Sequence, residues 1–98
     1  GNSALHIAAS RASLGVTRII IQAGADLNAL NHKGKPPLSL AAENGQEAVV
    51  SLLLTRNGVD RDSKDNAGRT PLSLAAENGQ EGVVKLLLVK NGIDPDSK

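Results

Sequence analysis

The sequence predicts an all-α fold, a solenoid of stacked helix–turn–helix units joined by projecting loops or short hairpins. The eleven residues PLSLAAENGQE stand at 37–47 and again at 71–81. A more divergent copy precedes them, because Ser3–Ala9 aligns with Pro36–Ala42, so that successive units are spaced by 33 and 34 residues. Within each copy apolar residues recur three and four positions apart, which is the spacing of one helix face.

The first helix of a unit is clearest in the third copy. Thr70 is a good N-cap residue, and Pro71 suits the first helical position, where a missing N–H costs no intrahelical hydrogen bond. Leu72, Ala75 and Ala76 then fall on one face of the helix. We therefore expect a short amphipathic helix that begins at Pro71.

Four Asn-Gly pairs, which begin at residues 44, 57, 78 and 91, are predicted to end helices. Asn-Gly is also a signal for a two-residue hairpin, but the flanking residues here have helical spacing rather than alternation. The second helix of the third unit should run between the last two pairs. Val83, Val84, Leu87 and Leu88 recur there with helical spacing.

Alanine pairs indicate why the units must stack. Ala41-Ala42 and Ala75-Ala76 allow neighbouring first helices to approach closely, while the leucines of the second helices fill the other side. One helix pair cannot bury both of its faces, so each unit needs a neighbour. We expect a single array with units at about 1–30, 31–64 and 65–98. Polar capping units are missing at both ends, so we interpret the array as a fragment of a longer one.

A set of consensus-like residues carries a family resemblance, and it recurs in phase over essentially the whole chain. In the third unit the set is Asp65, Gly68, Thr70, Pro71, Leu72, Leu74, Ala75, Ala76, Gly79, Val83, Val84, Leu86 and Leu87. It resembles the ankyrin repeat, and the 34-residue variant is similar to the long arrays of fungal ankyrin proteins. The resemblance implies a protein-interaction module.

Several positions depart from that pattern. Pro36 replaces the capping threonine in the second unit, so the hydroxyl cap is absent there. Ser39 and Ser73 replace the histidine of the family, which only His6 retains, and the resemblance implies that this ring hydrogen-bonds between loops. Ala12 replaces the turn glycine of the other two units, so the first turn should be looser or differently bent.

Composition excludes several classes of function. The 98 residues include no Phe, Tyr, Trp, Met or Cys, and 11 basic and 10 acidic residues give a formal charge of +1. Without aromatic side chains there is no stacking platform for single-stranded nucleic acid, and mixed charge gives no pull toward DNA or membranes. The apolar runs are too short to span a bilayer. The absence of Cys and of a visible signal peptide fits an intracellular, cytoplasmic protein.

Candidate metal sites are weak. The alternating acids of residues 60–65 resemble a calcium loop, but an EF-hand needs Gly at its sixth position and Glu at its twelfth, where this chain has Asp65 and Pro71. An Asx-rich turn is the better interpretation. His6 and His32 lack a third His or a Cys, so the ligand count does not support zinc. We expect His32 to be exposed at a loop tip.

Catalytic chemistry is equally unsupported. Ser39 and Ser73 have no His or Cys partner at matching positions in their own units, so we expect helix-surface serines that bond locally. The ten glycines are spread as turn residues and form no phosphate loop. We therefore predict no enzyme, no cofactor and no metal.

The favoured function is binding of a protein partner on a concave face made by the loop tips and the exposed side of the first helices. His32, Lys33 and Lys35 should form a small basic tip beside Arg11, which phosphate binding could use. The opposing acids Glu43 and Glu77 make a solvated mixed-charge surface the better interpretation. The candidate contact residues are Asn2, Ser10, Arg11, His32, Lys33, Lys35, Glu43, Asn44, Asn66, Ala67, Arg69, Glu77 and Asn78.

The alternative function is a structural spacer or a self-associating segment. Units this similar can stack end to end across chains, so the partner could be a second copy. Ile19, Ile20 and Ile21 near one end and Leu86, Leu87 and Leu88 near the other are the candidate exposed apolar residues.

Overall fold

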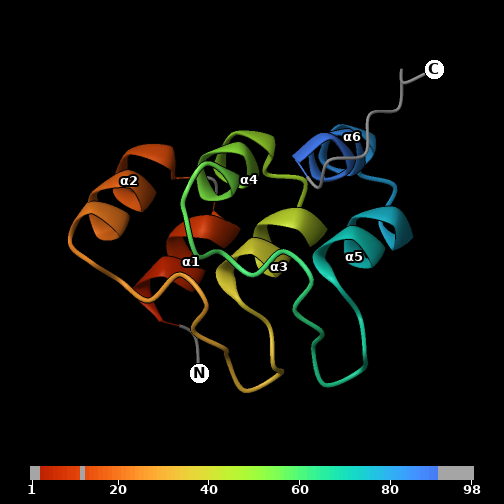
Figure 1. Ribbon diagram of the computed structural model, residues 1–98, viewed down its shortest axis with the longest axis horizontal. Helices are drawn as coiled ribbons and strands as arrows, with labels where there is room; N and C mark the ends of the chain where they lie inside the picture. The colour runs from red at the N-terminus through yellow and green to blue at the C-terminus, as the bar shows by residue number, and fades with distance from the viewer. Residues whose placement is uncertain (1–2, 12, 91–98) are drawn as a thin grey trace.

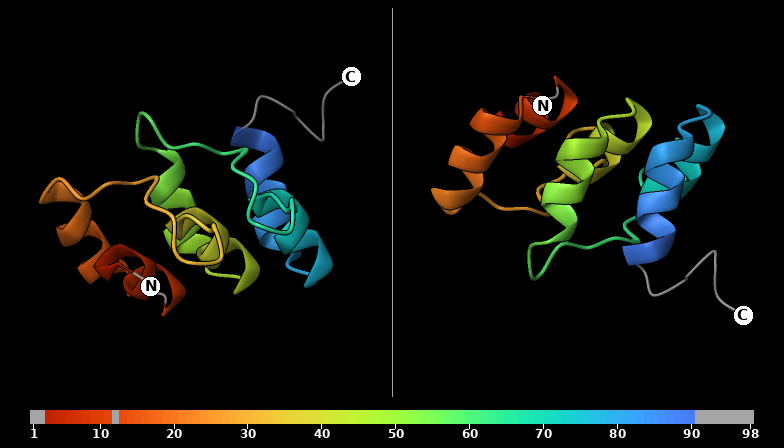
Figure 2. Two further views of the ribbon diagram at one scale, coloured as in Figure 1. Left: turned by 90° about the horizontal axis from the view of Figure 1, so that it is seen from below. Right: turned by 90° about the horizontal axis from the view of Figure 1, so that it is seen from above.

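A computed structural model describes residues 3–11 and 13–90 and shows a stack of helix pairs in two rows (Figure 1). The described helices are α1 (Ala4–Ser10), α2 (Leu14–Gln22), α3 (Pro37–Glu43), α4 (Glu47–Leu54), α5 (Pro71–Glu77) and α6 (Glu81–Lys90). Helices α1, α3 and α5 form one row and α2, α4 and α6 the other, as both views of Figure 2 show. The predicted all-α solenoid of three helix pairs is confirmed.

Each unit contacts the next along the row. Helix α3 packs against both α1 and α5, and α4 packs against both α2 and α6. The middle pair is therefore buried on two sides. No β-strand is present in residues 3–11 and 13–90, and the connections between units are loops.

Turns built on Asn-Gly end the first helices of the second and third units, as predicted. Gly45 has a φ of 71° and Gly79 a φ of 69°, a left-handed conformation that glycine adopts without strain. In the third unit the Gln80 N–H donates to the Ala75 carbonyl oxygen at 2.9 Å, which closes the turn. The expectations for the turn at Ala12 and for Asn91-Gly92 lie outside the described residues.

Two of the three first helices, α1 and α5, begin with a capping box. The Thr70 hydroxyl oxygen accepts a hydrogen bond from the Ser73 N–H at 3.2 Å, and the Ser73 hydroxyl oxygen accepts one from the Thr70 N–H at 2.9 Å. The Ser73 hydroxyl also donates to the Thr70 carbonyl, so the predicted local bonding of Ser73 is confirmed. This reciprocal capping box satisfies two backbone donors of the helix end.

The middle unit lacks this box. Pro36 makes no side-chain cap, as predicted, and it also has no N–H to offer. Ser39, which corresponds to Ser73, is fully buried, and its hydroxyl has no hydrogen-bond partner in the described part of the chain. The prediction of a helix-surface serine that bonds locally is therefore wrong for Ser39. Units on both sides cover it, and the donor that Thr70 supplies to Ser73 is absent at Pro36.

The core runs between the two rows and is built from Ala, Val and Leu. Its fully or almost fully buried residues are Ala9, Leu38, Ala41, Ala42, Val49, Val50, Leu53, Leu54, Ala75, Val83 and Leu87. Leu87 lies in the core between α4 and α6, so the prediction that it is exposed at the array end is wrong. Leu86 and Leu88 are half-buried, whereas Ile19 at the other end is 66% exposed.

We predict that Pro36→Thr stabilises the protein by about 1 kcal/mol. A restored capping box contributes about 1 kcal/mol, and a partner for Ser39 relieves a desolvation penalty of about 1–3 kcal/mol. Loss of proline rigidity costs about 0.4–1 kcal/mol through the unfolded chain, which is less than the gain. Urea denaturation measures the change. Ser39→Ala removes the unpaired hydroxyl, so it should stabilise the native chain by about 1 kcal/mol. In the Pro36→Thr variant, where the hydroxyl has a partner, Ser39→Ala should instead destabilise the protein. The same effect of Ser39→Ala in both backgrounds would contradict the role of the serine.

We predict that Leu53→Ala destabilises the protein by about 3 kcal/mol, because it opens a cavity in the middle unit. The matched control is Ile20→Ala, which changes the corresponding residue of the first unit. Ile20 is only half-buried, so its truncation should cost about 1 kcal/mol. Urea denaturation of both variants compares the costs. Equal losses would show that the middle unit is no better packed than the first.

Candidate interaction surface

Two loop tips project from the row of first helices on the same side of the molecule (Figure 1). Each tip is organised by one side chain. The Asp65 carboxylate accepts hydrogen bonds from the backbone N–H groups of Ala67 and Arg69, both at 2.9 Å, and the Asn31 side-chain oxygen accepts from those of Lys33 and Lys35, both at 3.0 Å. Corresponding residues of two units therefore fix the tips in the same shape.

Electrostatics at the third-unit tip favour the charged carboxylate. Hydrogen bonding from the Arg69 backbone N–H, helped by the Ala67 N–H and the Arg69 guanidinium, lowers the pKa of Asp65, although burial acts in the opposite direction. The guanidinium Nε lies 3.1 Å from the carboxylate. The tip is therefore stabilised while Asp65 is ionised.

Hydrogen bonds also hold neighbouring tips to one another. The Asn66 N–H donates to the Lys33 carbonyl oxygen at 3.0 Å, and the Asn66 side-chain amide donates to the His32 carbonyl oxygen at 3.1 Å. The spacing between the second and third tips is thus set by two hydrogen bonds from Asn66, one from its main chain and one from its side chain. Side chains that project from them keep fixed relative positions.

His6 ties the first unit to the second tip. Its ring is buried, Nδ1 accepts from the Ser3 N–H at 3.1 Å, and Nε2 lies 2.7 Å from the Lys35 carbonyl oxygen. Since Nδ1 acts as an acceptor, Nε2 carries the proton and donates to that carbonyl. The implied hydrogen bonding of this histidine between loops is confirmed.

The second and third units each pair a cation of the tip with an acid on the first helix. Lys35 Nζ lies 2.8 Å from Glu43, and Arg69 lies 4.0 Å from Glu77 at the corresponding positions. The Lys35 side chain is only 7% exposed, whereas that of Arg69 is 39% exposed, because the third unit covers the second. The expected exposed basic tip is therefore wrong at Lys35.

The other candidate contact residues divide by exposure. Exposed ones are Arg11, His32, Lys33, Asn44, Asn66, Ala67, Glu77 and Asn78, and half-exposed ones are Ser10, Glu43 and Arg69. Asn2 lies outside the described residues. The exposure predicted for His32 is confirmed.

The tips enclose a shallow hollow of about 400 Å³ that is lined by His32, Lys33, Asp65, Asn66, Ala67 and Arg69. The structure thus brings together candidates from the second and third units. Asp65 is the lining residue that the sequence analysis did not include among the contact candidates. The available signal was its position in the loop, because Asp65 corresponds to Asn31 one repeat earlier and both residue types commonly close loops.

Two searches of the described residues bear on other kinds of site. Over 3–11 and 13–90, no three His, Asp or Glu side chains gather in a group that could hold a metal ion. Within the same residues, every helix is too short or too polar to cross a membrane.

Stacked helix pairs with projecting, mutually bonded loops define a helical repeat protein. A family model described as ankyrin repeats (3 copies) matches residues 5–98. The chain belongs to the ankyrin-repeat family, as its sequence pattern predicts. Repeats of this family generally mediate protein–protein interaction.

Similar segments occur in larger proteins. The chain is 39% identical over 54 residues to protein phosphatase 1 regulatory subunit 12A of Mus musculus, and equally to that of Rattus norvegicus, which covers 55% of this chain and 5% of each relative. It is 40% identical over 53 residues to the probable E3 ubiquitin-protein ligase XBOS33 of Oryza sativa subsp. japonica, which covers 54% of this chain and 10% of that protein. The matches thus span a small part of each relative.

We predict that Asp65→Asn makes the free energy of unfolding fall less as the pH is lowered. The folded-state pKa of Asp65 is lowered from 3.8, so its ionised form contributes stability above that value, and the contribution is lost as the pH falls through the folded pKa. An Asn retains the side-chain oxygen that Asn31 uses at the other tip, but it does not titrate. The urea midpoint, measured from pH 7 to pH 3, should fall less for the variant than for the native chain. Parallel curves would contradict this assignment.

Proposed function

We propose that this chain is a non-catalytic protein-interaction module whose binding surface is the concave face formed by the loop tips and the exposed side of the first helices. The observation that carries the proposal is the ladder of hydrogen bonds from Asn66 to the backbone of the second tip. It holds the exposed side chains of two units at a fixed spacing.

The rigidity of the loop tips favours binding, because their conformation is already ordered before a partner docks. The backbone of each tip is held by its Asn31 or Asp65 side chain, and Arg69 is further held by two acids. A surface that is ordered before binding loses less conformational entropy when a partner docks. Polar side chains on such a surface can be selective without a large apolar contact.

The chemistry of the face indicates a polar protein partner. His32, Lys33 and Arg69 offer donors at the tips, while Glu77 and Asn78 offer acceptors at the C-terminal end of α5. The chain has no aromatic residue, so Arg69 is the residue of this set whose type is enriched at interface hot spots. We infer a partner surface with carboxylates opposite the tips and donors opposite α5.

Two further observations are consistent with this role. The mouse and rat relatives are named as regulatory subunits of protein phosphatase 1, which fits binding to another protein. Ser73 is one of the two serines considered as nucleophiles, and its hydroxyl is hydrogen-bonded in the helix cap. We place the protein inside the cell, in the cytoplasm, as its composition suggests.

The test is a pair of double variants. Partners are first captured by a photoreactive residue placed at position 33 and compared with those captured from position 85. Lys33→Glu with Arg69→Glu should then weaken binding of the captured protein about tenfold or more, since two charges of the face are reversed. Isothermal titration calorimetry measures the dissociation constant.

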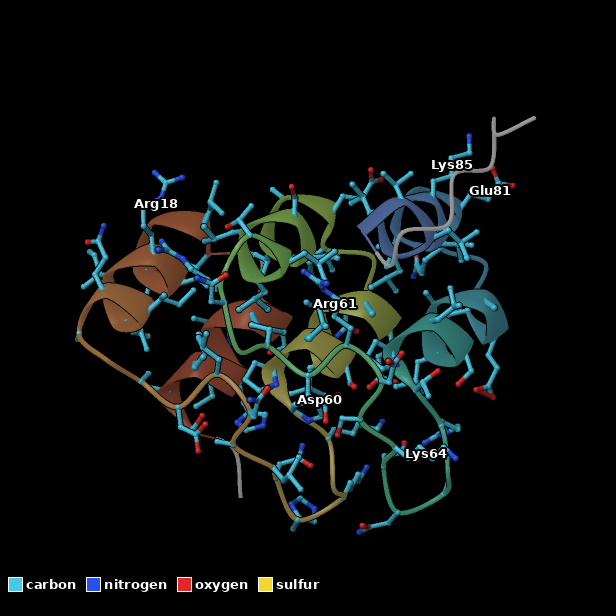
Figure 3. The ribbon with its side chains drawn as sticks, in the orientation of Figure 1. Arg18, Asp60, Arg61, Lys64, Glu81 and Lys85 are labelled. Atoms are coloured by element: carbon cyan, nitrogen blue, oxygen red, sulfur yellow. The ribbon has the colours of Figure 1, made fainter. Side chains whose placement is uncertain are left out.

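Arg18→Glu with Lys85→Glu is the matched control. It reverses the same number of charges on the row of second helices, away from the tips (Figure 3). The control should bind like the native chain. Equal weakening by both double variants would place the contact elsewhere, and no weakening by the first would reject the tip residues.

A further inference from the structure

The repeat itself reveals which residues need a neighbouring unit. Val50 and Leu54 of the middle unit are 0% and 2% exposed, because the third unit covers them. Their counterparts Val84 and Leu88 are half-buried, and Ala76 is exposed although its counterpart Ala42 is fully buried. We call Ala76, Val84 and Leu88 the α6 end face. No described helix covers it (Figure 2).

The opposite end of the array shows the complementary set. Val49 and Val83 are 1% and 0% exposed, since each packs toward the preceding unit, but their counterpart Val16 is 49% exposed. Ile19 and Ile7 of the same unit are 66% and 45% exposed. We call Ile7, Val16 and Ile19 the α2 end face. The apolar positions that are buried between units but uncovered at an end are thus Ala76, Val84 and Leu88 on the α6 end face and Val16 on the α2 end face. The counterparts of Ile19, which are Leu52 and Leu86, are half-buried.

A hollow on the α6 end repeats a place that is filled inside the array. It has a volume of about 260 Å³, and Ala76, Gly79, Gln80 and Val84 contribute to its lining. At the corresponding place on the middle unit, the Gln80 side chain lies against Gly45, and its amide donates to the Glu43 carbonyl oxygen at 3.2 Å. Because residues 71–81 repeat residues 37–47, this face has the chemistry that already receives a repeat unit.

A second feature matches the two ends to each other. Glu47 lies with its carboxylate against Gly82, where a Cβ atom would overlap it. The counterpart of Glu47 in the third unit is Glu81, and the counterpart of Gly82 in the first unit is Gly15, which has open space around it. A first unit placed on the α6 end would therefore offer glycine where Glu81 needs it.

The corresponding pair between the first two units has a different size. There Leu14 occupies the glutamate position and Ala48 the glycine position. At the interface of the second and third units a glutamate thus faces a glycine, and at the interface of the first and second units a leucine and an alanine occupy these two positions. Glu81 opposite Gly15 of another copy repeats the combination of glutamate and glycine.

We propose that the α6 end face binds the α2 end face of a second copy of this chain, with Glu81 against Gly15 of that copy. This interaction uses a surface other than the tips and goes beyond the proposed function. Two different faces meet, so the association is heterologous and leaves one free face of each kind. Copies therefore add in an open row.

One hydrogen bond of the internal interfaces is missing at this junction. Gln46 and Gln80 each donate to a carbonyl of the preceding unit, Ser10 and Glu43, but the first unit has Ser13 at that position. A serine is too short to make the same bond. The association is therefore weaker than the contact between units of one chain, and it is reversible.

The test uses one blocked face per variant. In sedimentation velocity the native chain should gain mass with concentration and pass beyond a dimer. Val16→Lys blocks the α2 end face and Ala76→Arg blocks the α6 end face, so each variant alone should be monomeric. Their equimolar mixture should form a heterodimer and nothing larger, because one compatible pair of faces remains.

The controls keep this test decisive. Leu30→Lys places the same charge on an exposed apolar residue of the loop after α2 and should associate like the native chain. A native chain that stays monomeric at its highest soluble concentration, a mixture without heterodimer, or a variant that dimerises alone overturns the proposal. Circular dichroism establishes that each variant is folded.

A gain of association gives an independent measurement should either blocked variant unfold. Ser13→Gln supplies the missing amide, which can donate to the Glu77 carbonyl oxygen of the next copy as Gln80 does to Glu43. One net hydrogen bond should tighten the association roughly two- to tenfold. Sedimentation equilibrium that shows no tightening overturns the proposal.

Discussion

Close contact between first helices is the constraint on which the remaining structure depends. Ala9, Ala41 and Ala42 and Ala75 are fully buried along the row of α1, α3 and α5, where a larger side chain would separate neighbouring helices. The loop tips sit directly on the N-terminal ends of these helices. Because the helices are close, the Asn66 side chain and the His6 ring reach the backbone of an adjacent loop. Packing in the core thus sets the geometry of the surface.

In most of the hydrogen bonds between units the acceptor is a main-chain carbonyl. His6, Gln46, Asn66 and Gln80 all reach the backbone of another unit. A carbonyl is present whatever residue occupies the position, so the side chain at the acceptor is free to change. The units can therefore differ at their exposed positions and still join in the same way. The missing cap at Pro36 shows that a hydrogen bond within a unit can also be lost without loss of the stack.

The sequence was sufficient for the fold because each unit carries its own local signals. Thr70, Pro71 and the Asn-Gly at 78 mark the ends of a helix by their own backbone preferences, and the structure places those ends accordingly. The orphaned Ser39 hydroxyl could also have been deduced, since a proline at the cap position offers no N–H. The tip geometry was partly predictable, because Asn31 and Asp65 are typical loop-closing residues.

Burial of the surface candidates was less predictable, since it depends on neighbours rather than on the residue. Lys35 and Arg69 occupy corresponding positions, yet the third unit covers the first of them. Leu87 was assigned to an exposed end although its own helix turns it toward α4. A repeat pattern gives the position within a unit, but exposure also requires the direction in which the next unit lies.

The nearest-neighbour arrangement also has a mechanical consequence. Gln46 joins the second unit to the first, and Gln80 joins the third to the second, each through one amide at the turn. A force that pulls the two ends of the row apart meets these joints in series rather than together. Under force the protein should consequently unfold one helix pair at a time. When the force is released, each pair should refold onto the pair next to it, and the chain should shorten in steps.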